Sequence, residues 1–195
     1  LYGRAFRAPT INELFVTSNS VNLGDPDLKP ETIDTYELAF SHQVSSELRY
    51  VTNTYYYKID GPIALNDISP VSKQWQNSND RSGYGAEFEI DYQVDSALRL
   101  LANYAYQKSE DDEENDDVGE HPNHQIYLRP EWKVNNKWLI SPQVNWVGEQ
   151  KRAPSDPRTD NVDHYTTVDL TIRQSDVVDS LDLSLSIRNF FDRNV

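Results

Sequence analysis

The sequence lacks several features that would point to common classes of protein. Its 195 residues include no Cys, which excludes disulfides, thiol chemistry and Cys-type metal sites. Lys and Arg are few beside Asp and Glu, 18 against 32, so the formal net charge is -14. Nucleic acid is not expected as a partner, because phosphate binding requires a basic face. Met is also absent, as we expect of a segment of a longer chain.

Long apolar runs are missing too. No stretch approaches the ~18 consecutive apolar residues of a membrane helix, and the mean hydropathy is -0.75. This excludes helical membrane proteins only, because the strands of a membrane barrel alternate lipid-facing and lumen-facing residues and have a low average hydropathy. Aromatic residues are abundant by contrast, with 12 Tyr and 4 Trp.

Apolar and polar residues alternate along most of the chain. Near residue 88, for example, Tyr84, Phe88 and Ile90 alternate with Glu87 and Glu89. A period of two predicts a β-strand with one apolar and one polar face. The pattern predicts strands at residues 1–7, 84–94, 98–107, 125–134, 138–147, 167–173 and 181–188, with less regular ones at 33–43 and 47–59.

The connections between these strands alternate in length. Short turns are expected near residues 44–46, 95–96, 135–136 and 175–180, and long connections at 8–32, 60–79, 109–121 and 150–163. Short turns on one side and long loops on the other are typical of an outer-membrane barrel. Strands of about ten residues also fit a tilted crossing of a bilayer, whereas strands of soluble domains average about 5–6 residues.

Aromatic residues gather at both ends of the predicted strands, on the apolar face. Such bands are the girdles expected at two membrane interfaces. We therefore predict an all-β fold, an antiparallel up-and-down transmembrane β-barrel, with a soluble β-sandwich as the alternative. The residues concerned are Tyr92, Trp132 and Trp138 near short turns, and Tyr84, Tyr106 and Trp146 near long loops.

Two prolines fall inside predicted strands. If residues 135–137 form a hairpin loop, Trp132 faces Ile140 and Pro130 faces Pro142. Each proline removes a donor from a ladder. We expect the two to form a non-hydrogen-bonded pair within the hairpin, so that the gap falls in the outer ladders.

The loop after residue 7 predicts its own short helix. Thr10 and Glu13 form a T-x-x-E capping box, in which each side chain satisfies a backbone N–H at the helix start. Ile11, Leu14 and Phe15 fall on one face of the turn. We expect this turn to pack the loop against its neighbours.

Four motifs in order then resemble the TonB-dependent outer-membrane receptors. Residues 6–9 read FRAP, and residues 25–31 read DPDLKPE before a strand that begins YELA at residue 36. NSNDRSGYGAEFEIDY and IRNFFDRNV are similar to two later segments of the family. The departures are minor: Asp25 and Ala39 stand where the family usually has Asn and Gly.

The resemblance implies a partial barrel, about nine strands of a 22-stranded one. Residues 1–195 would be its C-terminal portion, with the plug domain, the TonB box and the last strand outside the chain. It implies import of a ferric siderophore or similar scarce metal chelate in the bacterial outer membrane. The partners would be the ligand, outer-membrane lipid and, through the plug, the TonB complex; no cofactor is expected. Residues 10–24 contain no His, which counts against haem.

Two groups of residues are candidates for these roles. The first is predicted to anchor the loop to the barrel rim: Phe6, Arg7, Pro9, Glu13, Pro26 and Pro30. The second is predicted to contact an anionic ligand from the external loops: Lys151, Arg152, Arg158 and Trp75.

The remaining carboxylates favour plainer roles. Glu87, Glu89 and Asp91 share one strand face, which fits a wet lumen better than a catalytic pair. The acidic run at 110–117 lacks the spacing of a calcium-binding EF-hand loop and predicts a solvated loop. No G-x-S-x-G, P-loop or H-E-x-x-H motif is present, so we expect no enzyme. A passive porin and a secreted β-sandwich binding module stay open as alternatives.

Overall fold

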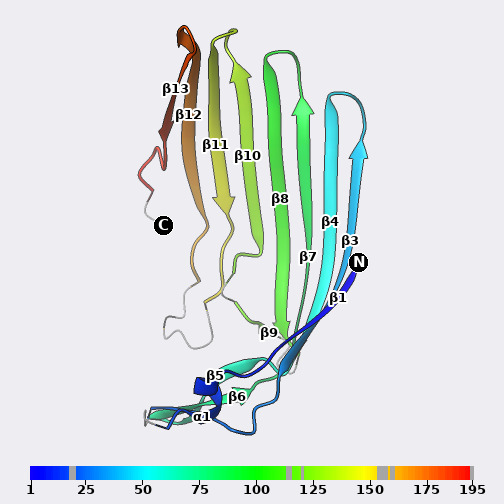
Figure 1. Cartoon of the computed structure of the whole chain (residues 1–195), viewed down its shortest axis with the longest axis vertical. Helices are drawn as coiled ribbons and strands as arrows, with labels where there is room; N and C mark the ends of the chain where they lie inside the picture. Colours follow the sequence, from blue (N-terminus) through cyan, green and yellow to red (C-terminus); the bar gives the residue numbers. More distant parts are fainter. Residues whose placement is uncertain (18–20, 113–115, 120, 153–157, 159–160, 194–195) are drawn as a thin grey trace. The chain divides into compact units, whose positions relative to one another are not determined.

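The computed structural model describes residues 1–17, 21–112, 116–119, 121–152, 158 and 161–193 (Figure 1). It contains one short helix, α1 (Ile11–Phe15), among the described residues. None of the described helices has the length and apolar content needed to cross a membrane. The strands are β1 (Tyr2–Arg7), β2 (Asn22–Leu23), β3 (Glu31–Gln43), β4 (Leu48–Asp60), β5 (Ile63–Ser69), β6 (Ser72–Asn77), β7 (Arg81–Gln93), β8 (Leu98–Asp111), β9 (Asp116–Asp117), β10 (His124–Lys133), β11 (Trp138–Val147), β12 (Tyr165–Val178) and β13 (Leu181–Ile187).

The large sheet has the predicted up-and-down order. Its strands follow one another as β1-β3-β4-β7-β8-β10-β11-β12-β13, with β9 paired to β8. The pairings of β1 with β3 and among β8 to β13 within it are antiparallel. Residue contacts divide the chain into two units, of which the first comprises residues 1–38, 55–84 and 108–118 and the second residues 39–54, 85–107 and 119–195.

A second, three-stranded sheet in the first unit was not predicted. It has the order β2-β6-β5, with β2 parallel to β6 and β5 antiparallel to it. The sequence pattern predicted a long connection at residues 60–79. Strands of six or seven residues joined by a tight turn give too few alternations to stand out from a loop.

Three tight turns in the second unit share one design. In each, a valine N–H donates to the carbonyl four residues later, at 2.8–3.0 Å, as from Val44 to Leu48. A short polar side chain then accepts from the backbone N–H groups two and three residues on. The accepting residues are Ser45, Asp95 and Asn135.

Successive turns are also bonded to the next strand pair. The carbonyl of Glu47 accepts from the N–H of Gln93 at 2.8 Å, and that of Ala97 accepts from Lys133 at 2.7 Å. Lys137 accepts in the same way from Ser175 at 2.8 Å. Backbone hydrogen bonds between neighbouring hairpins therefore stabilise the short-turn end, at the top of Figure 1, in addition to the bonds within each turn.

The hairpin register around the strand prolines is as predicted, but the expected location of the ladder gap is wrong. Leu128 pairs with Val144 and Trp132 with Ile140, so Pro130 lies opposite Pro142. Both outer ladders continue without a break through the prolines. The pairing of β10 with β11 is instead interrupted between these two pairs.

The gap falls within the hairpin because of the direction in which the backbone N–H groups of β10 point. The N–H of Val134 donates to the carbonyl of Trp138 across the hairpin, whereas that of Lys133 donates to Ala97 of the neighbouring hairpin. The backbone N–H and C=O groups of successive residues point to opposite sides of a strand. Those of residue 130, like those of residue 134, therefore point into the hairpin. The two prolines therefore occupy a hydrogen-bonded position of their own hairpin, and the missing donors affect only that ladder.

The apolar face of β10 is more open than its polar face. On β10, Ile126, Leu128 and Trp132 are exposed, whereas Tyr127, Arg129 and Glu131 between them are half-buried. On β11, the buried residues include Ser141 on the polar side. This is the reverse of a soluble β-sandwich, in which the apolar face is covered. The predicted period-two alternation is thus confirmed on β10, where the apolar side is the more exposed.

We predict that a charge on the open apolar face destabilises the sheet in lipid far more than the same charge on the polar face. Leu128→Arg is expected to cost ~2–4 kcal/mol near the bilayer midplane. Gln143→Arg, at the polar face beside Tyr127, is the control and should cost much less. Denaturant unfolding of the full-length protein in vesicles measures both. Equal costs would contradict the assignment of the two faces.

Candidate functional site

The polar face of the second unit carries a connected row of ion pairs. The Arg99 guanidinium binds the Asp91 carboxylate through two hydrogen bonds, Nε–Oδ1 at 2.8 Å and Nη2–Oδ2 at 2.6 Å. Glu131 lies 3.7 Å from Arg99 and 2.8 Å from Arg129. These charges come from β7, β8 and β10, so the row fixes a hydrophilic surface across three strands.

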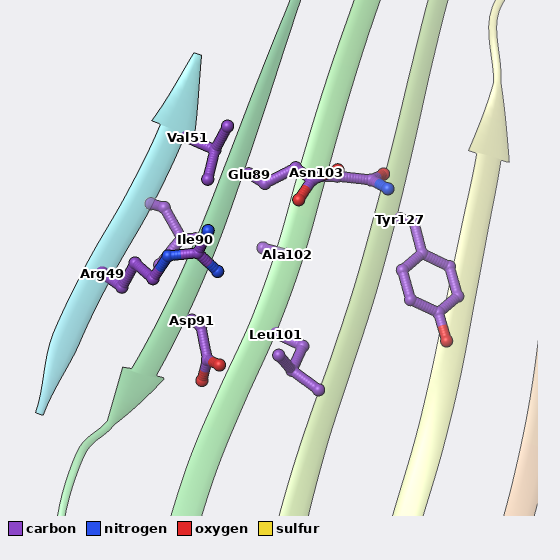
Figure 2. Close-up of a pocket in the computed structure, with 9 residues that line it drawn as sticks. All are labelled: Arg49, Val51, Glu89, Ile90, Asp91, Leu101, Ala102, Asn103 and Tyr127. Carbon is purple, nitrogen blue, oxygen red and sulfur yellow. The ribbon is translucent and has the colours of Figure 1, made fainter. Parts of the chain in front are cut away.

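A groove of about 230 Å³ lies beside this row. Figure 2 shows its lining residues on four neighbouring strands: Arg49 and Val51 on β4, residues 89–91 on β7, residues 101–103 on β8, and Tyr127 on β10. Arg49, Asp91, Asn103 and Tyr127 give it charged, amide and phenol groups together. Such a surface suits contact with water or with a polar partner rather than with hydrocarbon.

The polar face offers no constellation for metal chemistry. Within the described part of the chain, no group of three or more His, Asp or Glu side chains is arranged to hold a metal ion. Glu87 and Glu89 are both exposed and line a second small groove with Asn103, Gln125 and Asn145. The predicted row of lumen carboxylates therefore shares one polar face, as expected.

In the first unit, Arg7 joins the FRAP segment to two other segments. Its guanidinium donates from Nη1 to Glu13 of α1 at 2.9 Å and from Nε to Glu31 at 2.6 Å. Glu31 begins β3 and also accepts from the backbone N–H of Ile63, at the start of β5, at 2.8 Å. One arginine thus links the ends of β1, α1, β3 and β5. We call Arg7, Glu13 and Glu31 the arginine clamp.

Asn77, at the end of β6, makes a second link between loop segments. Its side-chain oxygen accepts from the N–H of Lys29 at 2.9 Å, and its nitrogen donates to the carbonyls of Lys29 and Gly61 at 3.0 and 2.8 Å. Asp80 accepts from the N–H of Gly61 at 3.0 Å and from Lys58 at 3.1 Å. The 25–31 segment is therefore tied to the β4–β5 turn.

The anchor is polar, where the sequence predicted an apolar one. Within α1, Ile11 is 78% exposed and Phe15 60% exposed, whereas Glu13 is only 7% exposed. The expectation that the apolar face packs the loop is therefore wrong. The capping box is present as predicted, and it aligns Glu13 with Arg7: the N–H of Thr10 donates to Glu13 Oε2 at 2.6 Å.

The six predicted anchor residues differ in their contacts and in their burial. Arg7 and Glu13 make the contacts just described, and Pro9 is half-buried. Phe6, Pro26 and Pro30 are exposed, so no burial supports an anchoring role for them. Leu28, which the sequence analysis did not single out, is the buried residue of the 25–31 segment.

Gly24 allows a close approach of two backbones. Its N–H donates to the carbonyl of Val16 at 2.8 Å, and that of Asp25 donates to the carbonyl of Glu13 at 2.8 Å, so the segment caps the end of α1. A Cβ at position 24 would lie 2.7 Å from the nitrogen of Val16 and 2.8 Å from the carbonyl of Leu14. Only glycine fits without a shift of backbone.

The clamp stabilises the charged form of Glu13. Burial acts to raise its pKa, but hydrogen bonds from the Thr10 backbone N–H and the Arg7 guanidinium outweigh burial, so its pKa is lowered. At Asp80, the hydrogen bond from the Gly61 N–H, followed by that from Lys58, lowers the pKa as well. Both groups are therefore ionised partners of the loop contacts near neutral pH.

The predicted ligand contacts lie in separate parts of the chain. Trp75 is on β6 of the first unit, opposite Leu65. Lys151, Arg152 and Arg158 belong to the second unit; the first two are half-buried and Arg158 is exposed. Part of the acidic run, residues 113–115, lies outside the described residues. The ligand-binding role of all four residues stays a prediction.

Comparison with known proteins gives a consistent pattern. A family model described as "TonB dependent receptor-like, beta-barrel" matches residues 2–190. The chain is 24% identical to the heme/hemopexin utilization protein C of Haemophilus influenzae (strain 86-028NP), over 98% of this chain and 31% of that protein. It is 27% identical to the ferric aerobactin receptor of Escherichia coli, over 99% and 26%. The chain thus spans about a third or less of these relatives.

Solved structures share the fold at low identity. The copper transporter OprC superposes with a TM-score of 0.81 at 19% identity, over 98% of this chain and 31% of that one. A mutant of the ferric enterobactin receptor of Pseudomonas aeruginosa, in complex with enterobactin, gives 0.80 at 18% identity, over 98% and 32%. The sheet order is therefore that of a β-barrel wall.

We predict that Glu13→Gln loosens the loop, because it leaves Arg7 without one carboxylate. Hydrogen bonds to charged groups contribute about 1.5–3 kcal/mol each, so local opening should become about 1–3 kcal/mol easier. A spin label at Ile11→Cys in the full-length protein reports this as increased mobility. Asp27→Asn is the control, because its side chain is exposed. No difference between the two variants would contradict the clamp.

The same label tests the pH dependence. Because the pKa of Glu13 is lowered in the folded protein, its contribution is fully present above its unfolded pKa and is lost as the pH falls through the folded value. The label should therefore stay ordered at neutral pH and become mobile only in acid, below the ordinary pKa of a glutamate. Mobility that increases toward alkaline pH would contradict this.

Gly24→Ala should weaken the cap of α1, because its Cβ meets backbone at 2.7–2.8 Å. Overpacking of this kind costs about 1–3 kcal/mol. Gly3→Ala is the matched control, since nothing lies within 4 Å of a Cβ there. Limited proteolysis of residues 8–30 in the folded full-length protein compares the two. Faster cleavage of both variants, or of neither, would count against the proposed cap.

Proposed function

Because the chain belongs to the TonB-dependent receptor-like β-barrel family, we propose that it forms part of the wall of a receptor that imports a ferric siderophore. The chain lies in the bacterial outer membrane, and the family is one of receptors rather than enzymes.

The observation that carries the proposal is the reversed arrangement of the two sheet faces. An exposed apolar face with aromatic residues at both ends, among them Trp132, Trp138 and Tyr84, suits contact with lipid. The ion-paired face then lines the barrel interior. There it would surround an enclosed plug, through which the TonB complex would act. The plug and the closing strand would lie outside residues 1–195.

The arginine clamp supports ligand capture by the long connections. A loop whose ends are already fixed by Arg7, Glu13 and Glu31 loses less conformational entropy when it meets a ligand. Lys151, Arg152 and Arg158 stand on another long connection and would attract an anionic chelate in an otherwise acidic chain. Trp75 would add a flat aromatic surface.

A ferric siderophore is favoured over haem by one feature of the sequence. Haem receptors of this family usually carry a His between the two loop motifs, and residues 10–24 contain none. One relative is named as a ferric aerobactin receptor and another as a heme utilization protein. The relatives therefore support uptake of a scarce iron compound, and the missing His favours a siderophore.

Growth and uptake in the native bacterium test this function. We expect deletion of the whole gene to abolish growth on at least one ferric siderophore of a panel and to leave growth on haem intact. Uptake of radiolabelled iron on that siderophore should stop when a protonophore collapses the proton gradient. Uptake that continues would identify a passive porin, and loss of growth on haem alone would identify a haem receptor.

The basic loop residues give a finer test. Replacing Lys151, Arg152 and Arg158 together by Gln should weaken binding of that siderophore, with the salt dependence of binding reduced. Replacing Lys133 and Lys137 by Gln serves as a control, because both lie at the short-turn end of the second unit rather than on a long connection. Unchanged affinity in the triple variant would remove these residues from the ligand site.

A further inference from the structure

The backbone hydrogen bonds at the two ends of the β10–β11 hairpin share one phase. Near the turn, the N–H of Val134 donates to the carbonyl of Trp138 at 3.0 Å. At the other end of the hairpin, the N–H of Gly148 donates to the carbonyl of His124 at 2.8 Å. Both are pairs of even-numbered residues, and the register is the same on either side of the interruption at the prolines. The even-numbered pairs between the two ends therefore occupy hydrogen-bonded positions as well.

Two carbonyl groups in the middle of this hairpin consequently have no backbone donor. In a hydrogen-bonded pair, each residue donates its N–H to the carbonyl of the other. Pro130 and Pro142 have no N–H, so both bonds of their pair are lost, and each carbonyl points toward the opposite strand without a partner. In the wall of a barrel such carbonyls cost free energy, because hydrocarbon offers no donor.

Two side chains on the polar face beside this gap lack partners too. Ser141 is only 4% exposed, and its Oγ has no hydrogen-bond partner among the described residues. The Arg129 guanidinium donates from Nη2 to Glu131 at 2.8 Å, but its buried Nε has no partner in the described part of the chain. Ser141 and Arg129 each come directly before one of the prolines, so they flank the gap on its polar side.

These four groups match the hydrogen-bonding capacity of one water molecule. The two carbonyls need donors, and a water has two O–H groups to donate. The hydroxyl of Ser141 and the Nε–H of Arg129 need acceptors, and a water has two lone pairs. Buried waters typically make about three hydrogen bonds to polar groups that lack other partners. A metal cation suits the gap less well, because the guanidinium of Arg129 would repel it.

We propose that the gap between Pro130 and Pro142 is a binding site for a water molecule, which donates to both carbonyls and accepts from Ser141 and Arg129. The proline rings lie on the apolar face, as Leu128 does, so the water reaches the gap from the polar face. The site allows a hairpin of the barrel wall to carry a proline pair without leaving a carbonyl unpaired. The inference depends on the hydrogen-bonding phase of the hairpin and not on the cargo of the receptor.

A crystal structure of the full-length receptor, at a resolution that shows ordered waters, tests the site directly. We expect a water within about 3 Å of both proline carbonyl oxygens. The double variant Pro130→Ala with Pro142→Ala restores the two N–H donors, so the ladder closes and this water should be lost. A gap without density, a metal cation in the gap, or the same water retained in the double variant would overturn the proposal.

The sign of the stability change in Ser141→Ala gives a second test. If the water accepts from the hydroxyl, the variant should lower the folding equilibrium constant of the full-length protein in vesicles by roughly two- to tenfold. Without a bound water, removal of a buried hydroxyl that has no partner would leave the constant unchanged or raise it, and either result would overturn the proposal.

The same substitution in the Pro130→Ala and Pro142→Ala background should have almost no effect, because the closed ladder no longer holds the water. Ser184→Ala on β13 is the matched control, since that side chain is exposed. An equal loss of stability in the control, or in the closed-ladder background, would count against the site. Neither measurement involves siderophore uptake, so the outcome is separate from that of the proposed function.

Discussion

The structure depends on one constraint: a sheet whose apolar face is open must have hydrocarbon as its solvent. In water the exposed Ile126, Leu128 and Trp132 would cost free energy, and in a bilayer the same residues are solvated. Hydrocarbon in turn leaves every backbone N–H and C=O to be satisfied within the sheet. The long antiparallel ladders, and the bonds that join successive short turns, meet that demand along the described strands. The ion pairs on the other face then need a wet interior.

The two ends of the strands solve different problems. At the short-turn end, valine and a small polar residue repeat in each turn, as in Val44-Ser45 and Val94-Asp95, so local chemistry sets the geometry. At the other end the connections are long, and residues far apart in sequence must be joined. The arginine clamp does this with one buried carboxylate, Glu13, held in its charged form. Rigid loop ends are what a receptor needs to present binding residues with little entropic loss.

Much of this could be predicted from the sequence, and the misses have physical causes. Period-two alternation located most of the long strands within a few residues, because one face of each regular strand is largely apolar. The capping box at Thr10 and Glu13 was found because it is local. Glu31, Asn77 and Leu28 were missed because their roles depend on partners 16 to 48 residues away or on burial. The proline pair was placed correctly. Which ladder loses the two donors could be decided only once the structure showed which residue pairs of the hairpin are hydrogen-bonded.

The central claim is that alternate residues of each strand face lipid and the barrel interior. Spin labels at single cysteines placed at Ile126, Tyr127, Leu128 and Arg129 of β10, in the full-length protein in vesicles, test it most directly. Accessibility to oxygen, which partitions into lipid, should be high at 126 and 128, and accessibility to a water-soluble nickel chelate should be high at 127 and 129. A reversed alternation, or equal accessibility at all four positions, would contradict the account.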